Sequence, residues 1–354
     1  MRLALADLLP SKLAAAWGAL RATKHRAPSD IAHWHETRQQ VPPLAEIRTL
    51  LQCVGAESSD GPALSGKGLP DLASIKRGIA AEVQSRLAAG ETAQAMKAAH
   101  RLAALDLNDT GAFRIYLGLV SLASAAALAQ ARSRLGPKVV LHVSCRPRLE
   151  RARESSVSFE PAARAGISQL IVVGSPAASA FDFDAAGNVL SVPAADTYEQ
   201  LPEKVVNAFF FLSLCGHVDA VLKVDDDHRL RATAPLLDAF GRLRSRVPVQ
   251  AGRRSNSHVV GLHSRVWHFG KCADPQRDAR PYALLAPSRW IDGAGGYFLN
   301  RAALRLMLWS HVYFGDYVRI GLYEDLIVSD LVERQGGRLV DLDMAAVLQA
   351  VEDY

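Results

Sequence analysis

Hydrophobic and polar positions follow two different patterns on either side of residue 135. Before it, apolar residues recur at the spacing of amphipathic helices, as at Ile79, Val83 and Leu87. After it, short β-branched runs bounded by turn residues alternate with helical segments, which is typical of buried strands in an α/β protein. We therefore predict an all-α N-terminal region at residues 1–135 and an α/β domain at residues 136–354.

The N-terminal region contains a break and one helical unit. Residues 54–70 are rich in glycine, serine and proline and predict a linker. Residues 79–132 resemble a tetratricopeptide-like helical hairpin, near the middle of which Asp109 begins a further helix. Such a region serves either as a helical cap on the domain that follows or as a peptide-binding repeat array. Its helices could also bind a membrane surface peripherally or bind a protein partner.

The α/β domain contains five segments that predict strands, at residues 138–145, 168–176, 188–193, 218–224 and 337–343. The helical pattern returns between these strands, at residues 199–214, 235–243, 301–309 and 325–335. Strands that alternate with helices predict a mostly parallel sheet covered on both faces. In such sheets ligands bind at the carboxyl ends of the strands, so we expect a site there.

Composition narrows the class of protein without naming a function. The chain is 49% hydrophobic and 22% charged, with a formal net charge of +5, as in an ordinary globular protein. No block of lysine and arginine with interleaved aromatic residues occurs, which argues against nucleic-acid binding. The four cysteines form no CxxC pair, which argues against a structural zinc site and a dense disulfide framework.

The sequence also predicts a cytoplasmic protein. The apolar run in "MRLALADLLP" is short and is interrupted by Asp7, which is not typical of a signal peptide. The longest uncharged segment, residues 115–131, is diluted by alanine, serine and glycine. It falls short of the roughly 20 strongly apolar residues that a membrane span requires.

The strand at residues 218–224 ends in three consecutive carboxylates, Asp225, Asp226 and Asp227. Crowded carboxylates repel one another unless a cation or hydrogen-bond donors compensate. Oxygen ligands without nearby cysteine favour Mn²⁺ or Mg²⁺ over zinc. Because side chains alternate along an extended segment, we expect Asp225 and Asp227 to face the ligand and Asp226 to point elsewhere. His228 is interpreted as a neighbour of this site and not as a ligand.

A second acidic pair, Glu324 and Asp325, lies in the first turn of the predicted helix near the C-terminus. The helix macrodipole stabilises a carboxylate there and is expected to keep it ionised. Between the two acidic motifs, residues 290–304 predict a glycine-rich turn followed by a helix. Glycines let a backbone approach a ligand closely.

Each of these motifs also has a purely structural interpretation. The acidic triplet could be a solvated turn that caps the helix beginning near Ala234. The pair Glu324 and Asp325 could simply complement the helix dipole, and the glycine-rich segment could be a tight turn without a ligand.

Taken in order, these segments resemble glycosyltransferase family 31, which includes the β-1,3-galactosyltransferases and Fringe. The similarity covers roughly residues 138–345 and rests on the segments "VVLHVSC", "RPRLERARESS", "DTYEQLPEKV", "VLKVDDD", "WIDGAGGYFL" and "YEDL". It implies a GT-A (Rossmann-like) fold, a UDP-sugar donor, a divalent metal at the DxD element and inversion at the anomeric carbon. The implied acceptor is a hydroxyl of a glycan or lipid-linked glycan, as in surface polysaccharide synthesis.

The resemblance assigns roles by position. It places the DxD element at Asp225, Asp226 and Asp227, with Asp225 and Asp227 on the metal and Asp225 and Asp226 toward the donor. It makes Asp325 the catalytic base, beside Glu324. The nucleotide side falls to Asp196, Tyr198 and Lys204, and the border between donor sugar and acceptor falls to Asp292, Gly295 and Gly296.

One departure from the family leaves alternatives open. Members commonly carry a histidine beyond the Glu-Asp motif as a further metal ligand, whereas the last histidine here, His311, precedes that motif. The alternatives to a glycosyltransferase are another metal-dependent phosphohydrolase, which uses two metal ions and more carboxylates, and an inactive glycosyltransferase-like binding protein.

Overall fold

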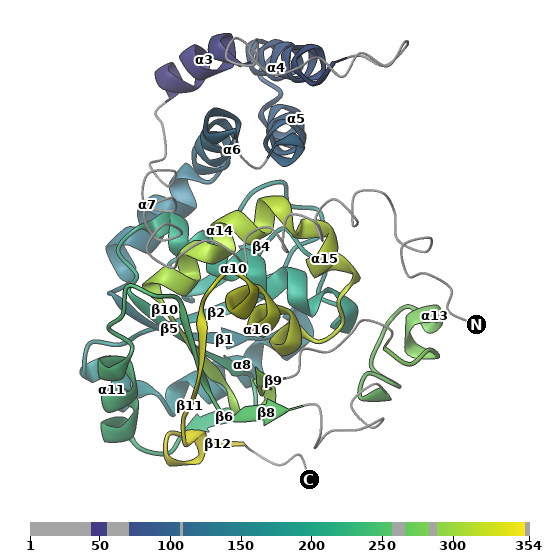
Figure 1. Ribbon diagram of the computed structural model, residues 1–354. Coiled ribbons are helices and arrows are strands. Elements are labelled where there is room, and N and C mark those ends of the chain that lie inside the picture. Colours follow the sequence, from purple (N-terminus) through teal and green to yellow (C-terminus); the bar gives the residue numbers. More distant parts are fainter. Residues whose placement is uncertain (1–43, 55–70, 107–108, 257–265, 283–288, 351–354) are drawn as a thin grey trace. The chain divides into compact units, whose positions relative to one another are not determined.

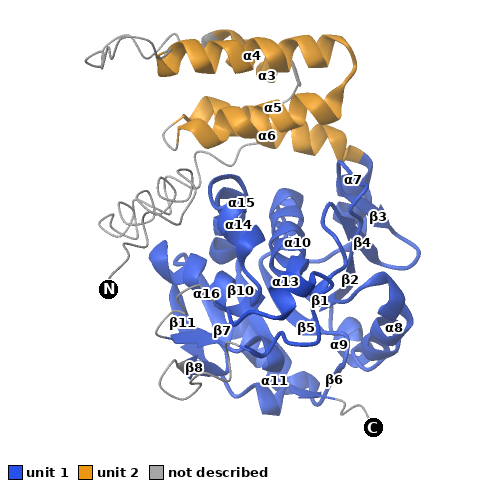
Figure 2. Ribbon diagram, turned by 90° about the vertical axis from the view of Figure 1, so that its right-hand side faces the viewer, with its two compact units in different colours: residues 1–32, 126–354 blue, residues 33–125 orange. Residues whose placement is uncertain are grey.

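The computed structural model describes residues 44–54, 71–106, 109–256, 266–282 and 289–350, whose helices and strands are labelled in Figure 1. They form two compact units, one of residues up to Ala125 and the other of residues from Ala126 onward (Figure 2). Most of the predicted linker and the chain before residue 44 lie outside the described residues.

The first unit is helical. Asp71 begins α4 by accepting the N–H of Ser74, and Asp109 begins α6 by accepting the N–H of Ala112, as expected for N-cap residues. Helix α4 packs on α5, and α5 packs on α6. The bounds are α3 (Leu44–Cys53), α4 (Leu72–Ala88), α5 (Thr92–Leu105) and α6 (Thr110–Ala123).

The second unit is mixed α/β and is built on an eight-stranded, mostly parallel sheet with strand order β11-β7-β10-β5-β1-β2-β4-β3. Strand β10 runs antiparallel to both of its neighbours, β5 and β7, and the edge strand β3 is antiparallel to β4. The other neighbouring pairs are parallel. The bounds are β1 (Lys138–Val143), β2 (Ser168–Gly174), β3 (Asp182–Asp184), β4 (Val189–Val192), β5 (Ala220–Asp225), β7 (Val249–Gly252), β10 (Tyr297–Asn300) and β11 (Arg338–Asp341).

The five predicted strands are present as β1, β2, β4, β5 and β11. Strands β7 and β10 were not predicted. The predicted turn and helix within residues 290–304 are present, as the turn Gly293–Gly295 and the helix that begins at Arg301, with β10 between them. Each of these strands has only four residues, all buried. A short, continuously buried strand has no alternation of polar and apolar positions to reveal it.

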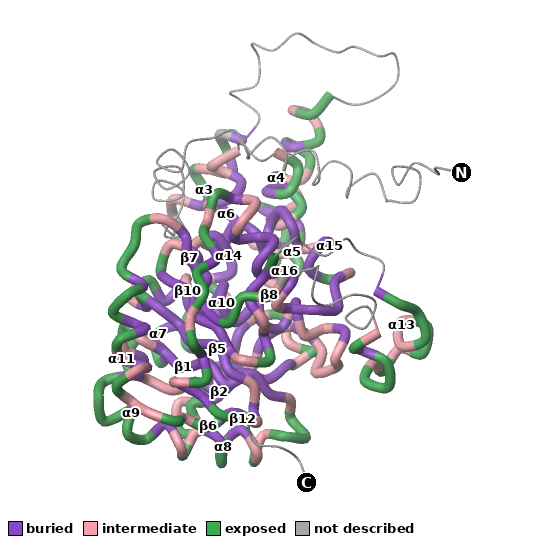
Figure 3. Tube along the Cα trace, turned by 60° about the horizontal axis from the view of Figure 1, so that its bottom comes forward, coloured by how far each residue is buried: buried purple, intermediate pink, exposed green. Residues whose placement is uncertain are grey.

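Helices cover both faces of the sheet (Figure 1). One face packs against α10 (Leu201–Cys215), α14 (Arg301–Tyr313) and α16 (Glu324–Arg334). The other face carries α8 (Leu149–Val157), α9 (Glu160–Arg164) and α11 (Thr233–Arg242). The central strands β1, β2 and β5 are therefore buried along most of their length (Figure 3), and functional groups can reach solvent only at the strand ends.

No single helix among the described residues is both long and apolar enough to cross a membrane. Helix α6 and the following α7 (Ala125–Arg134) meet that criterion only when they are taken together across a sharp bend. Three cysteines of the described residues, Cys145, Cys215 and Cys272, are free thiols.

Candidate active site

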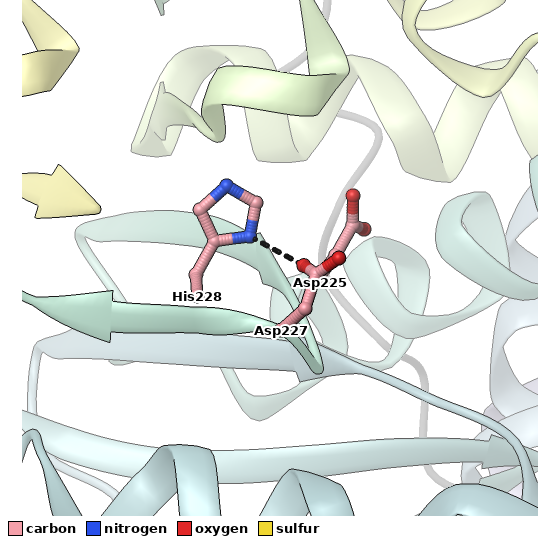
Figure 4. Close-up of side chains that lie close together, drawn as sticks. All are labelled: Asp225, Asp227 and His228. Atoms are coloured by element: carbon pink, nitrogen blue, oxygen red, sulfur yellow. Dashed lines mark ion pairs between the residues drawn. The ribbon is translucent and has the colours of Figure 1, made fainter. Parts of the chain in front are cut away.

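The acidic triplet lies at the carboxyl end of the central strand β5. Asp225 is the last residue of that strand, Asp226 and Asp227 form a turn, and β6 (His228–Leu230) follows at once. One ligand atom each from Asp225, Asp227 and His228 lie within 4.8 Å of one another (Figure 4). The two carboxylates and the imidazole therefore offer a donor set for one cation.

The triplet does not cap the next helix. Helix α11 begins at Thr233, its N-cap residue is Ala232, and no side chain caps it. Strand β6 separates the carboxylates from that helix. The interpretation of the triplet as a helix cap is therefore wrong.

Asp226 is not part of this donor set. It is buried and its Oδ2 accepts the hydroxyl of Ser144, which follows β1, over 2.7 Å. Burial raises the pKa of Asp226, while the Ser144 hydrogen bond opposes that rise. Two guanidinium groups, those of Arg148 and Arg151, lie 3.9 and 3.8 Å from its other oxygen. The expected alternation assumed an extended segment, whereas Asp226 and Asp227 form a turn.

A fully buried lysine joins the two acidic motifs. The Nζ atom of Lys223, on β5, lies 2.7 Å from Asp225 Oδ1 and 3.4 Å from Glu324 Oε2. Burial alone would lower the pKa of Lys223, but these two carboxylates raise it above its usual range. Glu324 also accepts the hydroxyl of Tyr297 from the neighbouring strand β10. Residues about a hundred positions apart thus share one ammonium group.

Asp325 is held by two backbone donors at the start of α16. Its Oδ2 accepts the N–H of Gly293 over 3.0 Å, and its Oδ1 accepts the N–H of Leu326 over 2.9 Å. Burial, and after it the charge of Glu324, raises the pKa of Asp325 from 3.8 to about 7. The helix macrodipole was expected to keep this carboxylate ionised, and desolvation acts against that effect.

The short turn Gly293–Gly295 contacts both Asp325 and His228. Gly293 holds Asp325, and the carbonyl of the adjacent Ala294 lies 2.9 Å from Nε2 of His228. Asp292 begins this turn by accepting the N–H of Ala294 and pairs with Arg253. One three-residue turn consequently fixes the distance between the candidate cation ligands and Asp325.

The glycines of this segment have unequal roles. A Cβ atom at Gly293 would lie 2.9 Å from Asp325 Cβ, and Gly296 has a φ of +70° with Leu348 Cδ1 2.8 Å from its would-be Cβ. Gly295 has nothing closer than 3.9 Å. Of the two predicted glycines, only Gly296 is required by the backbone, and Gly293 was missed.

The residues predicted for the nucleotide side lie at the ends of β1 and β2. Asp196 accepts the N–H groups of Gly174 and Arg146 over 2.5 and 2.8 Å and pairs with Lys204 over 3.1 Å. Lys204 also donates to the carbonyl of Ser144 over 2.5 Å. Because the Ser144 hydroxyl bonds Asp226, this network is continuous with the acidic triplet.

Tyr198 begins a short 3₁₀ turn after Asp196 and is partly buried. Burial, followed by the charges of Tyr323 and Asp325, raises its pKa. The Lys271 ammonium lies 5.7 Å from the centre of its ring and 4.0 Å from that of the exposed Trp267. Tyr198 is therefore near enough to Asp325 for the two groups to interact electrostatically.

Sequence reasoning missed several residues of the site. His228, Lys223, Ser144, Gly293 and the arginines after β1 were not assigned a role. Lys223 carried a usable signal, because a charge inside an otherwise apolar strand needs a buried partner. His311, the last histidine of the chain, stacks on Phe210 with ring centres 4.4 Å apart.

No protein-family model matches this chain, and no curated protein matches it either.

Proposed function

We propose that this protein is an inverting, metal-dependent glycosyltransferase with a GT-A domain, which moves a sugar from a UDP-sugar to a hydroxyl of a glycan acceptor. One observation carries the proposal. A single turn holds a carboxylate with a pKa of about 7, Asp325, next to a cluster of cation-ligand atoms at the carboxyl end of a central strand. The mostly parallel sheet and the ordered family-31-like motifs support the same class.

The donor atoms of the cluster fit a divalent cation. Asp225 and Asp227 provide carboxylate oxygens, and His228 provides a ring nitrogen, which suits Mn²⁺ or Mg²⁺ better than a structural zinc. Such a cation neutralises charge that develops on a diphosphate leaving group. The residues that would hold it are those at the end of β5, where sheets of this kind bind ligands.

Asp325 is the proposed general base. An acceptor hydroxyl is a poor nucleophile, and a carboxylate with a pKa near the working pH removes its proton efficiently. The N–H groups of Gly293 and Leu326 fix the orientation of this carboxylate. Glu324 is held in turn by Lys223 and Tyr297, so its role is to position its neighbour and to raise its pKa. Direct attack by the acceptor inverts the configuration at the anomeric carbon.

The remaining residues are assigned to the donor. Arg148 and Arg151 lie within 4 Å of the carboxylates of Asp226 and Asp227, where guanidinium groups suit a diphosphate. Asp196 and Lys204 brace the adjoining strand ends. In this proposal they shape the nucleotide side instead of contacting the ribose directly, because both Asp196 oxygens already accept backbone N–H groups.

The test is UDP release from a panel of UDP-sugars with Mn²⁺ present, for the native chain and for Asp227→Asn and Asp325→Asn. Both variants should lose at least about 100-fold in turnover, as expected when a group acting on the reacting atoms is removed. Asp238→Asn on α11, whose side chain is 61% exposed, is the matched control and should keep native turnover. Native turnover in both site variants would refute these roles. Phosphate release with two bound ions would instead favour a phosphohydrolase, and donor binding without turnover would favour a binding protein.

A further inference from the structure

We propose that His228 is the third protein ligand of the cation, through Nδ1, and that this nitrogen makes the site prefer Mn²⁺ to Mg²⁺. The inference rests on the proposed function only in taking the cluster of Asp225, Asp227 and His228 as a cation site. It concerns a residue that neither the DxD pattern nor the motif resemblance assigns to the metal.

The ring of His228 has a defined hydrogen-bonding state. Its Nε2 lies 2.9 Å from the carbonyl oxygen of Ala294. A carbonyl oxygen only accepts hydrogen bonds, so Nε2 carries a hydrogen. In the neutral imidazole the lone pair is then on Nδ1, the nitrogen that binds a metal or a second proton.

That lone pair points at another acceptor. Nδ1 of His228 lies 3.1 Å from Oδ1 of Asp227, as Figure 4 shows. Only 3% of the His228 surface is exposed, and neither atom has another hydrogen-bond partner among the described residues. Two buried acceptors face each other unless a positive species lies between them. That species is either a shared proton or a cation bound by both atoms.

The geometry fits the cation. Adjacent ligands of an octahedral ion bound at about 2.1 Å lie about 3.0 Å apart, close to the 3.1 Å between Nδ1 and Oδ1. Asp225 contributes a third atom within 4.8 Å of both. A proton would join only Asp227 and His228, whereas a cation would take one ligand atom from each of the three residues. Asp225 keeps its ion pair with Lys223 in either case.

The surroundings of His228 are those of a metal-ligating histidine. Such residues donate the other ring N–H to a carbonyl or carboxylate, which fixes the tautomer and the ring orientation. The Ala294 carbonyl has that role here. The hydroxyl of Ser155 on α8 also donates to the backbone carbonyl of His228, so both the ring and the main chain are held. These two hydrogen bonds fix the direction in which Nδ1 of His228 would bind a cation.

A nitrogen ligand changes which ion is preferred. Mg²⁺ is bound by oxygen atoms and water, whereas imidazole favours first-row transition ions, with affinity rising from Mn²⁺ to Co²⁺. Two carboxylates and one imidazole therefore predict the order Co²⁺, Mn²⁺ and then Mg²⁺ in binding strength. Removing the imidazole should bring the Mn²⁺ and Mg²⁺ affinities closer together.

The experiment measures ion binding without any sugar donor. Mn²⁺ is titrated into the native chain, His228→Ala and His228→Gln, with free Mn²⁺ followed by EPR and Mg²⁺ used as a competitor. Pulsed EPR of the bound ion then reports directly coordinated nitrogen. The native chain should show that nitrogen coupling, and both variants should lose it with at least about a 10-fold weaker Mn²⁺ affinity. Mg²⁺ affinity should fall less than Mn²⁺ affinity.

The control is His217→Gln, which removes an imidazole whose nitrogens lie 3.2 Å from the carbonyl of Cys215, at the end of α10, and 2.7 Å from the carbonyl of Leu135. It should keep both the nitrogen coupling and the Mn²⁺ affinity, and thermal unfolding of each metal-free variant reports its folding. Three outcomes would overturn the proposal. The native chain could bind Mn²⁺ without nitrogen coupling, a folded His228 variant could keep the native Mn²⁺ affinity, or the native chain could bind no Mn²⁺ at all. If the native chain shows nitrogen coupling but turns over no UDP-sugar, the assignment of His228 as a cation ligand stands and only the proposed function is refuted.

Discussion

Gly293 and Asp325 are in direct backbone-to-carboxylate contact across 32 residues of sequence, with the Gly293 N–H 3.0 Å from Asp325 Oδ2. The approach is so close that a Cβ atom on Gly293 would lie 2.9 Å from Asp325 Cβ and 3.2 Å from Glu324 Oε2. Distances below 3.0 Å force one partner to move. The position of the proposed base therefore depends on the absence of a single methyl group.

Substitution Gly293→Ala should displace Asp325 and lower kcat by about 10- to 100-fold, since a misplacement of about 1 Å can cost that much. Binding of the cation, measured separately, should change much less. Gly241→Ala on α11 is the control, because its Cβ would meet no atom within 4 Å, and it should keep native kcat. Equal kcat values for the two variants would contradict the role of the turn.

The pH dependence of turnover should report Asp325. The pKa of this carboxyl is raised from 3.8 to about 7 by burial and by Glu324, and only its ionised form accepts a proton. Activity should therefore be low well below pH 7, rise as the pH passes about 7, and level off above it. Glu324→Gln removes a charge that raises this pKa, so the rising limb should move to lower pH. A rising limb that stays in place in this variant would show that another group titrates.

The acidic triplet and the glycine turn show what the sequence could and could not predict. The end of β5 was predictable because seven mostly apolar residues precede three carboxylates. The function of Gly293 was not predictable, because its requirement comes from a residue 32 positions away. Long-range contacts of this kind have no local pattern.

The orientation of the His228 ring also depends on a long-range contact that the sequence does not reveal. Its place after the triplet was visible in the sequence, but whether its ring turns toward Asp227 depends on the carbonyl of Ala294, 66 residues further on. The raised pKa of Asp325 was missed for a related reason. A helix N-terminus is readable from sequence, whereas the desolvation that acts against its dipole arises only when the helix packs.

Asp226 and Asp227 should separate stability from cation binding. Asp226 is buried and bonded to Ser144, so Asp226→Asn should lower the free energy of unfolding by about 1 kcal/mol and leave Mn²⁺ affinity within about 3-fold. Asp227 has a side chain that is 38% exposed, so Asp227→Asn should weaken Mn²⁺ by at least about 10-fold with little loss of stability. Urea unfolding and Mn²⁺ titration of both variants measure the two effects. The reverse pattern would mean that Asp226 is the ligand.

Lys223 should be the most important single charge for the stability of the site. Its side chain is 1% exposed and lies between Asp225 and Glu324, so Lys223→Met leaves two carboxylates without their buried counter-charge. Removing one partner of a buried ion pair costs about 3–5 kcal/mol, and the urea midpoint should fall accordingly. Lys271→Met, at an exposed lysine that stacks on Trp267, is the control and should cost less than about 1 kcal/mol.

The loss in Lys223→Met should depend on pH with a definite sign. Burial raises the pKa of Glu324 and Lys223 lowers it, so without the lysine this carboxyl protonates at higher pH. The variant should therefore lose most stability at alkaline pH and recover part of it as the pH falls and the buried carboxyl becomes neutral. Adding Glu324→Gln to Lys223→Met should likewise restore part of the loss, because one unpaired charge is removed. A cost that is independent of pH, and additive with Glu324→Gln in a double-mutant cycle, would show that the lysine acts by packing and not by charge.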